Sequence, residues 1–233
     1  MQDYQPTKTM DAQMMQRTMA TVAEAAKHGD TCLLFWSATG KDSIVLLDLL
    51  SPHFKKVVCV YLYIVKNLNI VEPFFRWAQS YGNVEIVQLP HPDRIKYKKA
   101  GLFDIKPMPQ LKKLKLKDYE DYLKKEYQTD VVVYGMKITD SFVRRGIFNK
   151  AAKSEIHMDF GKYYPIVCWS NKDCISYITI HNLPQPLKLG SKRPSSGINF
   201  REETILYIKK HYPLDYQKYI KDYPLIGAKY GNQ

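Results

Sequence analysis

The chain has 233 residues, of which 45% are hydrophobic; this excludes a disordered chain and allows one sizeable domain with an appendage, or two small domains. No apolar run is long enough to span a membrane and residues 1–15 hold no apolar signal core, so a cytoplasmic protein without membrane contacts is expected. The formal net charge of +12 predicts attraction to polyanions or to anionic small molecules.

The first predicted elements are a helix and a strand–turn–helix unit. Apolar residues fall on one face over residues 11–27, which predicts an amphipathic helix with Asp11 placed to cap it and Gly29 to end it. Residues 31–50 begin as a short apolar run, break at a turn of small residues and resume with helical spacing. Ser43 is predicted to cap this second helix, because a serine hydroxyl at a helix start can accept a backbone N–H.

Strands and helices then alternate. Residues 55–65 are apolar on both faces, which is typical of a strand buried in a parallel sheet. A helix is predicted over residues 69–82, with Pro73 in its first turn, and a third strand over residues 83–90. A fourth strand follows over residues 130–136. This alternation predicts an α/β fold with a doubly wound, mostly parallel sheet.

A helix that Asp118 would cap precedes the fourth strand. After Pro165 the character of the chain changes, and another helix is predicted over residues 171–181. The tail beyond it is rich in proline, serine and tyrosine. We therefore expect a main domain over residues 1–185 and a C-terminal helical and loop extension over residues 186–233.

The cysteines give no sign of a metal site or of disulfides. Cys32, Cys59, Cys168 and Cys174 form no C-x-x-C pair and no metal-ligand spacing. Reduced and mostly buried thiols are the expected state.

The turn between the first strand and its helix carries the most informative chemistry. A helix N-terminus presents unpaired backbone N–H groups and a partial positive charge, so this turn predicts an anion cradle, where Gly40 allows close approach. A Walker phosphate loop is excluded, because Asp42 follows Lys41 and Phe35 stands where the first glycine would be. A dinucleotide-binding glycine pattern is absent as well.

Three stretches in order resemble one known family. The turn "SATGKDS" is similar to the S-G-G-x-D-S pyrophosphate loop of the PP-loop superfamily, with Ala38 and Thr39 as departures. "GMKITDSFVRR" is similar to the G-x-R-x-x-E-S-x-x-R stretch of the phosphoadenosine phosphosulfate (PAPS) reductase family, which includes the small subunit of ATP sulfurylase. "PIVCWSNKDCISYI", from Pro165 to Ile178, resembles the family's P-L-x-x-W-T-x-x-D block. The resemblance covers roughly residues 30 to 190.

The resemblance and the residue types together predict a nucleotide site. Backbone N–H groups from Thr39 to Ser43 would hold an oxyanion, and the resemblance places an adenine against the backbone after residues 61–65. Lys41, Asp42 and Arg144 are the predicted catalytic residues. The predicted nucleotide-binding residues are Ser37, Ala38, Thr39, Gly40, Lys41, Asp42, Ser43, Gly135, Lys137, Arg144 and Arg145.

Single positions have more specific expectations. Asp42 lies where phosphates are expected, so it is predicted to cap the turn or to bind Mg²⁺. Lys137, Arg144 and Arg145 are predicted to neutralise phosphate or sulfate charge. In the third block, packing roles are favoured for Trp169 and Tyr177, and a capping or pairing role for Asp173.

The resemblance implies ATP, adenosine phosphosulfate or PAPS as the ligand. The family's reductases carry a C-terminal E-C-G-L-H-type segment whose thiolate attacks sulfur, but no cysteine follows Cys174 here. Thiol-dependent reduction is therefore not expected. Because the cysteine pattern of iron–sulfur reductases is missing too, the expected cofactor set is nucleotide and Mg²⁺ without an iron–sulfur cluster.

Two classes of function stay open. The first is an enzyme that acts on ATP or a sulfonucleotide at the α-phosphate with release of pyrophosphate, by adenylyl transfer or as ATP sulfurylase does. The second is an inactive PP-loop module that binds nucleic acid or a partner protein. It would make contact through the basic segment, from Arg94 to Lys117, which contains nine basic residues and one acid, Asp104, and so carries a net charge of +8. A homo-oligomer is compatible with both.

Overall fold

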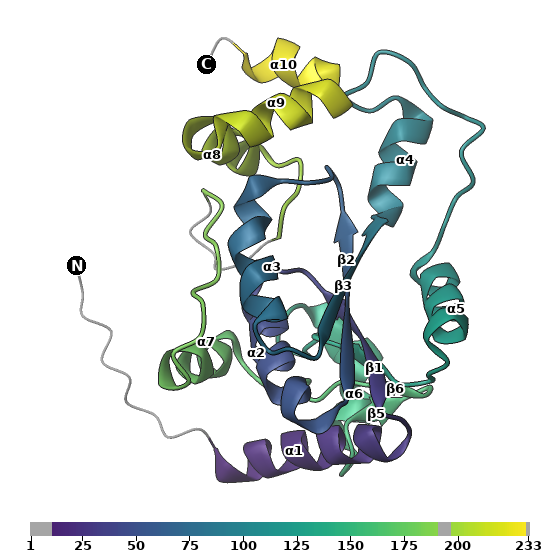
Figure 1. The fold of residues 1–233 in the computed structure, drawn as a ribbon, viewed down its shortest axis with the longest axis vertical. Coiled ribbons are helices and arrows are strands. Elements are labelled where there is room, and N and C mark those ends of the chain that lie inside the picture. The colour runs from purple at the N-terminus through teal and green to yellow at the C-terminus, as the bar shows by residue number, and fades with distance from the viewer. Residues whose placement is uncertain (1–10, 191–196, 232–233) are drawn as a thin grey trace.

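A computed structural model describes residues 11–190 and 197–231. Its centre is a six-stranded sheet in the order β3-β2-β1-β4-β6-β5 (Figure 1). The strands are β1 Thr31–Trp36, β2 Lys56–Tyr63, β3 Val84–Pro90, β4 Val132–Tyr134, β5 Met158–Asp159 and β6 Lys162–Tyr163. The first four run parallel, β6 pairs parallel with β4, and β5 pairs antiparallel with β6. The predicted α/β fold with a mostly parallel sheet is confirmed.

Helices surround this sheet. They are α1 Ala12–Lys27, α2 Lys41–Leu50, α3 Glu72–Gln79, α4 Pro92–Ala100, α5 Leu116–Tyr127, α6 Phe142–Lys153, α7 Asn171–Ile180, α8 Glu202–His211, α9 Pro213–Asp222 and α10 Pro224–Tyr230, with short 3₁₀ turns at Ser51–His53 and Asn69–Val71. Within the described ranges, none of these helices has the length and apolar character needed to cross a membrane.

Each face of the sheet buries its own core. Side chains of α1, α2, α3 and α7 share one apolar cluster with Leu34, Trp36 and Cys59 of the sheet. On the opposite face, Leu123 of α5 and Phe148 of α6 pack with neighbouring strand residues. The sheet is therefore doubly wound, because crossover helices cover both of its faces.

The strand order places a topological switch point between β1 and β4. The chain proceeds from β1 outward to β2 and β3, and then returns to the other side of β1 to form β4. In open parallel sheets, ligands bind outside the carboxyl ends of the strands at such a point. The turn after β1 and the segment after β4 meet there, as the sequence predicts.

Helix starts agree with the sequence in most places. Asp11 caps α1, Pro73 lies in the first turn of α3, and Asp173 with Ser170 forms a capping box on α7. Asp118 differs, because α5 starts two residues before it. Its carboxylate accepts the N–H of Lys115 at 2.6 Å from the third helical position.

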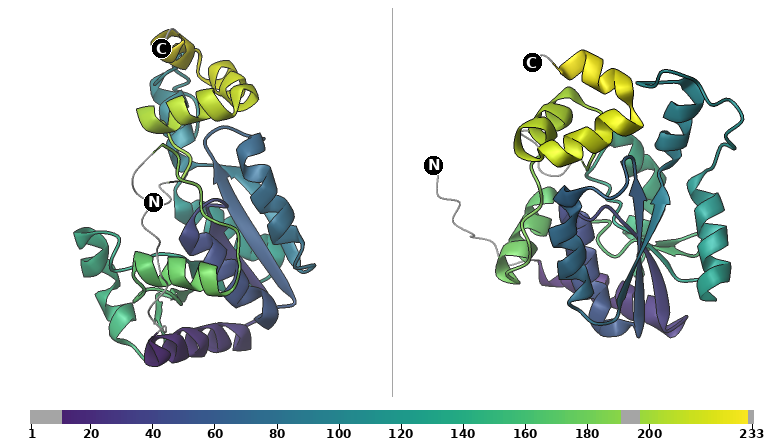
Figure 2. Two further views of the ribbon diagram at one scale, coloured as in Figure 1. Left: turned by 90° about the vertical axis from the view of Figure 1, so that its left-hand side faces the viewer. Right: turned by 45° about the horizontal axis from the view of Figure 1, so that its top comes forward.

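The C-terminal helices pack against one end of the sheet. Figures 1 and 2 show α8–α10, in yellow-green to yellow, together at the end opposite α1. The carboxylate of Asp215 is fully buried and accepts the N–H groups of Asn69 and Ile70, both at 2.8 Å. The Asp215 carboxylate therefore provides hydrogen-bond acceptors for the free N–H groups at the start of the 3₁₀ turn that follows β2. The predicted boundary at residue 185 stays a prediction, and the two parts share one apolar cluster.

Candidate functional site

The turn after β1 is held by two serines. The N–H of Ser37 donates to the hydroxyl of Ser43 at 2.9 Å, and the two hydroxyl oxygens lie 3.0 Å apart. The sequence predicts that Ser43 caps α2, but in the structure Ser43 does not cap this helix. Gly40 is the N-cap residue and has no side chain with which to cap. No hydrogen bond joins a described side chain to the N–H groups of Asp42 and Ser43, so the first turn of α2 keeps donors for a ligand.

The turn is packed closely enough to require its small residues. A Cβ atom on Gly40 would lie 2.4 Å from the hydroxyl oxygen of Ser37. Ala38 adopts a left-handed backbone conformation with φ of 59°. This conformation is unfavourable in free energy for any residue other than glycine. The carbonyl of Thr39 accepts the N–H of Leu187 at 3.2 Å, so the segment after α7 contacts the turn. This geometry is held from several sides.

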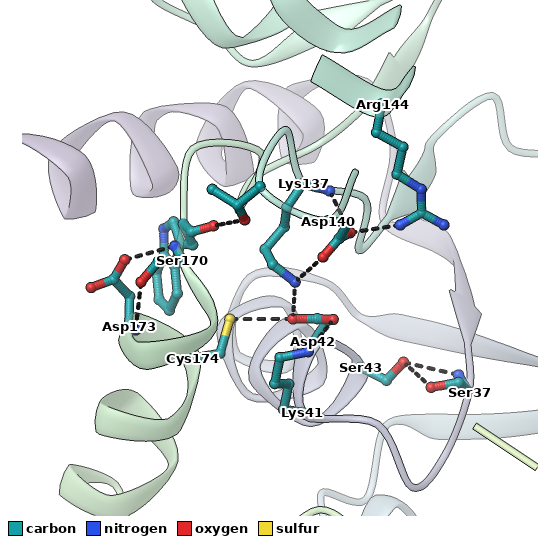
Figure 3. A network of polar contacts seen from close by, with 12 residues as sticks. Ser37, Lys41, Asp42, Ser43, Lys137, Asp140, Arg144, Ser170, Asp173 and Cys174 are labelled. Atoms are coloured by element: carbon teal, nitrogen blue, oxygen red, sulfur yellow. Dashed lines mark hydrogen bonds and ion pairs between the residues drawn. The ribbon is translucent and has the colours of Figure 1, made fainter. Parts of the chain in front are cut away.

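Beside the turn lies an ion-pair network that joins α2 to the segment after β4 (Figure 3). The ammonium of Lys137 is fully buried, 2.5 Å from Asp42 Oδ1 and 3.0 Å from Asp140 Oδ1. Burial alone would lower the pKa of Lys137, but the charge and hydrogen bond of Asp42, together with the charges of Cys174 and Asp140, outweigh it and the pKa is raised. Lys137 is therefore charged, and its charge is paired within the protein.

This pairing involves two residues with predicted roles. Lys137, predicted to neutralise phosphate, forms ion pairs with Asp42 and Asp140. The carboxylate of Asp42, predicted to cap the turn or to bind Mg²⁺, accepts hydrogen bonds from the ammonium groups of Lys137 and, at 3.1 Å, of Lys41. Both predicted roles stay predictions. Two cations at one carboxylate disfavour a third, because like charges repel. The described residues hold no group of three or more His, Cys, Asp or Glu side chains placed to bind a metal ion.

Cys174 completes the network from α7. Its thiol donates to Asp42 Oδ1 at 3.3 Å, across 132 residues of sequence. Burial, and then the charge of Asp42, raise the pKa of Cys174 well above its ordinary value. The thiol is therefore protonated and serves as a hydrogen-bond donor rather than as a nucleophile.

A cavity of about 300 Å³ opens over the carboxyl ends of the strands. Its polar lining comes from the turn after β1, the start of α2 and the region from the end of β4 to the start of α6, with Ser37, Asp42, Ser43, Gly135 and Arg144. The body of the cavity is apolar and is formed by Phe35, Val60, Leu62, Leu116 and Met136. A polar end at a helix N-terminus that continues into an apolar slot suits a molecule with a phosphate chain and a flat ring.

Arg144 and Arg145 are separated by their place on α6. The Arg144 guanidinium lines the cavity and donates to Asp140 at 2.6 Å. Its side chain keeps 42% of its surface exposed, so a ligand can reach it. Arg145 is exposed and does not line the cavity. Of this predicted pair, only Arg144 faces the ligand space.

The remaining predicted residues form the frame of the turn. Ala38, Thr39, Gly40 and Lys41 are buried in the turn or at the start of α2, and they are not among the described residues that line the cavity. Their backbone shapes the turn.

His91 also belongs to the site, although it is not among the residues predicted from the sequence. His91 follows β3, two strands away from β1, and lines the cavity. Its Nδ1 accepts the N–H of Asp93 at 3.0 Å, which leaves Nε2 as the protonated nitrogen. Burial lowers the pKa of His91, so the neutral ring is favoured. The rule that ligands meet strand ends points to this histidine, because it directly follows the third predicted strand.

The third sequence block is structural. Trp169 is fully buried, its ring centre lies 5.5 Å from that of Tyr177, and its indole N–H donates to Thr18 of α1 at 2.9 Å. The predicted packing roles are confirmed by this geometry.

Part of the basic segment turns inward. Arg94 pairs with Asp222 of α9 at 2.6 Å, and Lys98 pairs with Asp104 at 2.6 Å. Arg94 therefore joins α4 to α9, and Lys98 joins α4 to the loop that follows it. The remaining lysines of the segment are exposed. Its predicted role as a contact for nucleic acid or protein stays a prediction.

One known family matches the part of the chain that holds the three motifs. The family described as phosphoadenosine phosphosulfate reductase domain matches residues 32–189. The chain belongs to this family. The PAPS reductase match spans β1 to the segment after α7, and thus every residue that lines the cavity.

Other comparisons are more distant. No curated protein matches the sequence. Among solved structures, the U34-tRNA thiolase NcsA from Methanococcus maripaludis, described with its [4Fe-4S] cluster, aligns with a TM-score of 0.49 and 14% identity. The alignment covers 92% of this chain and 76% of the thiolase chain. At this identity the likeness concerns the fold alone.

The thiolase corrects the expected cofactor set. The prediction of nucleotide and Mg²⁺ without an iron–sulfur cluster is wrong as an exclusion, because a protein of similar fold is described with such a cluster. In this chain the cysteines do not converge. Cys32 and Cys59 lie in the core, Cys168 lies 3.8 Å from His157, and Cys174 contacts Asp42. These cysteines are therefore not placed to hold one cluster together, and neither finding assigns a cofactor.

Proposed function

We propose that this PAPS reductase-family protein binds ATP or a sulfonucleotide in the cavity and promotes displacement at the α-phosphorus with pyrophosphate as the leaving group. The observation that carries the proposal is the polarity of the cavity. Helix donors and the guanidinium of Arg144 lie at one end, and an apolar slot lies over β2. The phosphates would occupy the first end and the adenine the second.

Catalysis would be electrostatic. When the bond between the α-phosphorus and pyrophosphate breaks, negative charge grows on the leaving group. The N–H groups of Asp42 and Ser43 point from the N-terminus of α2, and Arg144 supplies a cation from the facing helix. Asp140 orients Arg144 through their 2.6 Å contact, and Lys137 keeps the charge of Asp140 compensated.

The attacking group would be sulfate, as in ATP sulfurylase, or an oxygen of a larger acceptor. A fully protonated Cys174 argues against sulfonucleotide reduction by this thiol, because a thiolate is the nucleophile in that chemistry.

A two-part experiment tests the proposal. Thermal unfolding with ATP, AMP, adenosine phosphosulfate or PAPS identifies the nucleotide, since a ligand of the folded state raises the melting temperature. Pyrophosphate release from ATP is then measured with sulfate and with candidate acceptors. We expect a melting shift with a nucleotide, and pyrophosphate release that falls at least tenfold in Arg144→Ala, because this variant removes the cation that faces the leaving group. A protein that no nucleotide stabilises, or full turnover in Arg144→Ala, would overturn the proposal.

A further inference from the structure

The outer face of α6 is unpartnered and positively charged. Phe142, Val143 and Ile147 are 88%, 68% and 59% exposed. The inner face of the same helix buries Phe148 and Ala151 against the sheet. An exposed aromatic ring beside two exposed aliphatic side chains on one helix needs an explanation, because apolar groups gain free energy from burial.

The charge of this helix has one sign. Its twelve residues include Arg144, Arg145, Lys150 and Lys153, and no acid. Arg144 is paired with Asp140, whereas Arg145, Lys150 and Lys153 form no ion pair with any described residue. Phe142, Gly146 and Lys150 follow at intervals of four, so the ring and a cation share one stripe. A Cβ on Gly146 would meet nothing within 4 Å, which leaves the stripe open between them.

We infer that this surface, consisting of Phe142, Val143, Arg145, Ile147 and Lys150 and called the α6 face below, binds single-stranded nucleic acid. A base would stack on the ring of Phe142, while Arg145 and Lys150 neutralise phosphates along the strand. Protein-binding surfaces concentrate apolar groups and deplete charge at their centre. The α6 face instead interleaves a ring with uncompensated cations, which favours nucleic acid over a protein partner.

The position of the face gives the contact a purpose. α6 starts at Phe142, two residues before Arg144, which lines the cavity. Leu116, at the start of α5, also lines the cavity and adjoins the exposed Lys115 and Lys117 of the basic segment. Two elements that line the cavity therefore carry exposed cations next to it, and a strand on the α6 face would pass close to the cavity. The inference does not depend on nucleotide turnover in the cavity.

Fluorescence anisotropy with a labelled, mixed-sequence single-stranded RNA, and with the corresponding DNA, tests the inference at several salt concentrations. Phe142→Ala is expected to weaken binding about 5- to 150-fold, as for the loss of one stacked base. The double variant Arg145→Ala/Lys150→Ala is expected to reduce the slope of log affinity against log salt by about 1.4.

The chain offers matched controls. Leu214→Ala removes a side chain that is 69% exposed on α9, and Lys210→Ala/Lys221→Ala removes two exposed cations from α8 and α9. These variants should leave affinity and salt slope unchanged. All of the altered side chains are exposed, so melting temperatures should match the wild type and folding is not at issue. Equal binding by all variants, or no binding by the wild type at low salt, would overturn the inference. Self-association that Phe142→Ala abolishes, without RNA or DNA binding, would overturn it in favour of a protein interface.

Discussion

Lys137 is the residue on which the site's electrostatics depend, and replacing it with methionine tests this. Lys137→Met keeps the length of the side chain but leaves Asp42 and Asp140 without an ammonium that lies 2.5 and 3.0 Å from them. Loss of one partner of a buried ion pair costs about 3–5 kcal/mol. Because the side chains of Asp42 and Asp140 are 22% and 17% exposed, water can solvate the two carboxylates in part and so reduce this destabilisation. We expect a loss of about 3 kcal/mol in the free energy of unfolding.

Urea unfolding at several pH values measures this loss and its origin. Burial alone would raise the pKa of Asp140, but the charge and hydrogen bonds of Lys137, together with the hydrogen bond of Arg144, hold it below its ordinary value. The stability that Asp140 contributes is therefore present at neutral pH, and it is lost as the pH falls through the lowered value. Lys137→Met removes the largest of these lowering effects, so the difference in unfolding free energy between wild type and variant should narrow on acidification.

A second substitution separates charge from packing. Adding Asp42→Asn to Lys137→Met removes one of the two carboxylates that have lost the Lys137 ammonium, and this double variant should regain about 1–2 kcal/mol in the free energy of unfolding at pH 7. A loss below about 1 kcal/mol for Lys137→Met, or a gap that does not change with pH, would refute the account of this network.

Two further predictions concern the cavity. Gly40→Ala should weaken nucleotide binding at least tenfold in calorimetric titration, because the new methyl group would lie 2.4 Å from the Ser37 hydroxyl oxygen. The double variant Gly40→Ala/Ser37→Ala lacks that oxygen and should regain part of the affinity; no gain would contradict the steric cause. His91→Ala should weaken ATP binding about 3- to 10-fold through loss of an Nε2–H donor, whereas His91→Gln keeps a donor and should retain more affinity. Because burial lowers the pKa of His91, the wild-type affinity for ATP should be the same at pH 7 and pH 8, and a difference between them would contradict a neutral ring.

The parts of the fold that were predictable depend on local patterns. Twenty consecutive residues contain the buried strand Thr31–Trp36, the small-residue turn and α2. Because ligands bind at the carboxyl ends of parallel strands, this turn could be placed at the site from the sequence. The two-residue strands β5 and β6 are too short for any periodic pattern. α4 was hidden within the basic segment, although Pro92 at its start and a left-handed Gly101 at its end are helix signals.

The parts of the site that were not predictable depend on contacts between distant residues. Lys137 and Asp42 are 95 residues apart, and Cys174 and Asp42 are 132 apart, so nothing in either stretch indicates the other. A basic residue near a phosphate loop suggests a ligand contact, and only burial shows that the charge of Lys137 is already paired. Likewise, adjacent arginines have equal weight in a sequence, but a helix turns by about 100° per residue and separates Arg144 from Arg145.

The most direct test of the central claim uses this adjacent pair. Isothermal titration of ATP, or of the nucleotide that stabilises the protein, is compared for wild type, Arg144→Ala and Arg145→Ala. The substitutions remove the same charge from the same helix, but only Arg144 lines the cavity. The account predicts a loss of about 10- to 150-fold for Arg144→Ala, as for a charge-assisted hydrogen bond, and a change below about 2-fold for Arg145→Ala. Equal losses in the two variants, or none in Arg144→Ala, would contradict a phosphate site at the turn after β1.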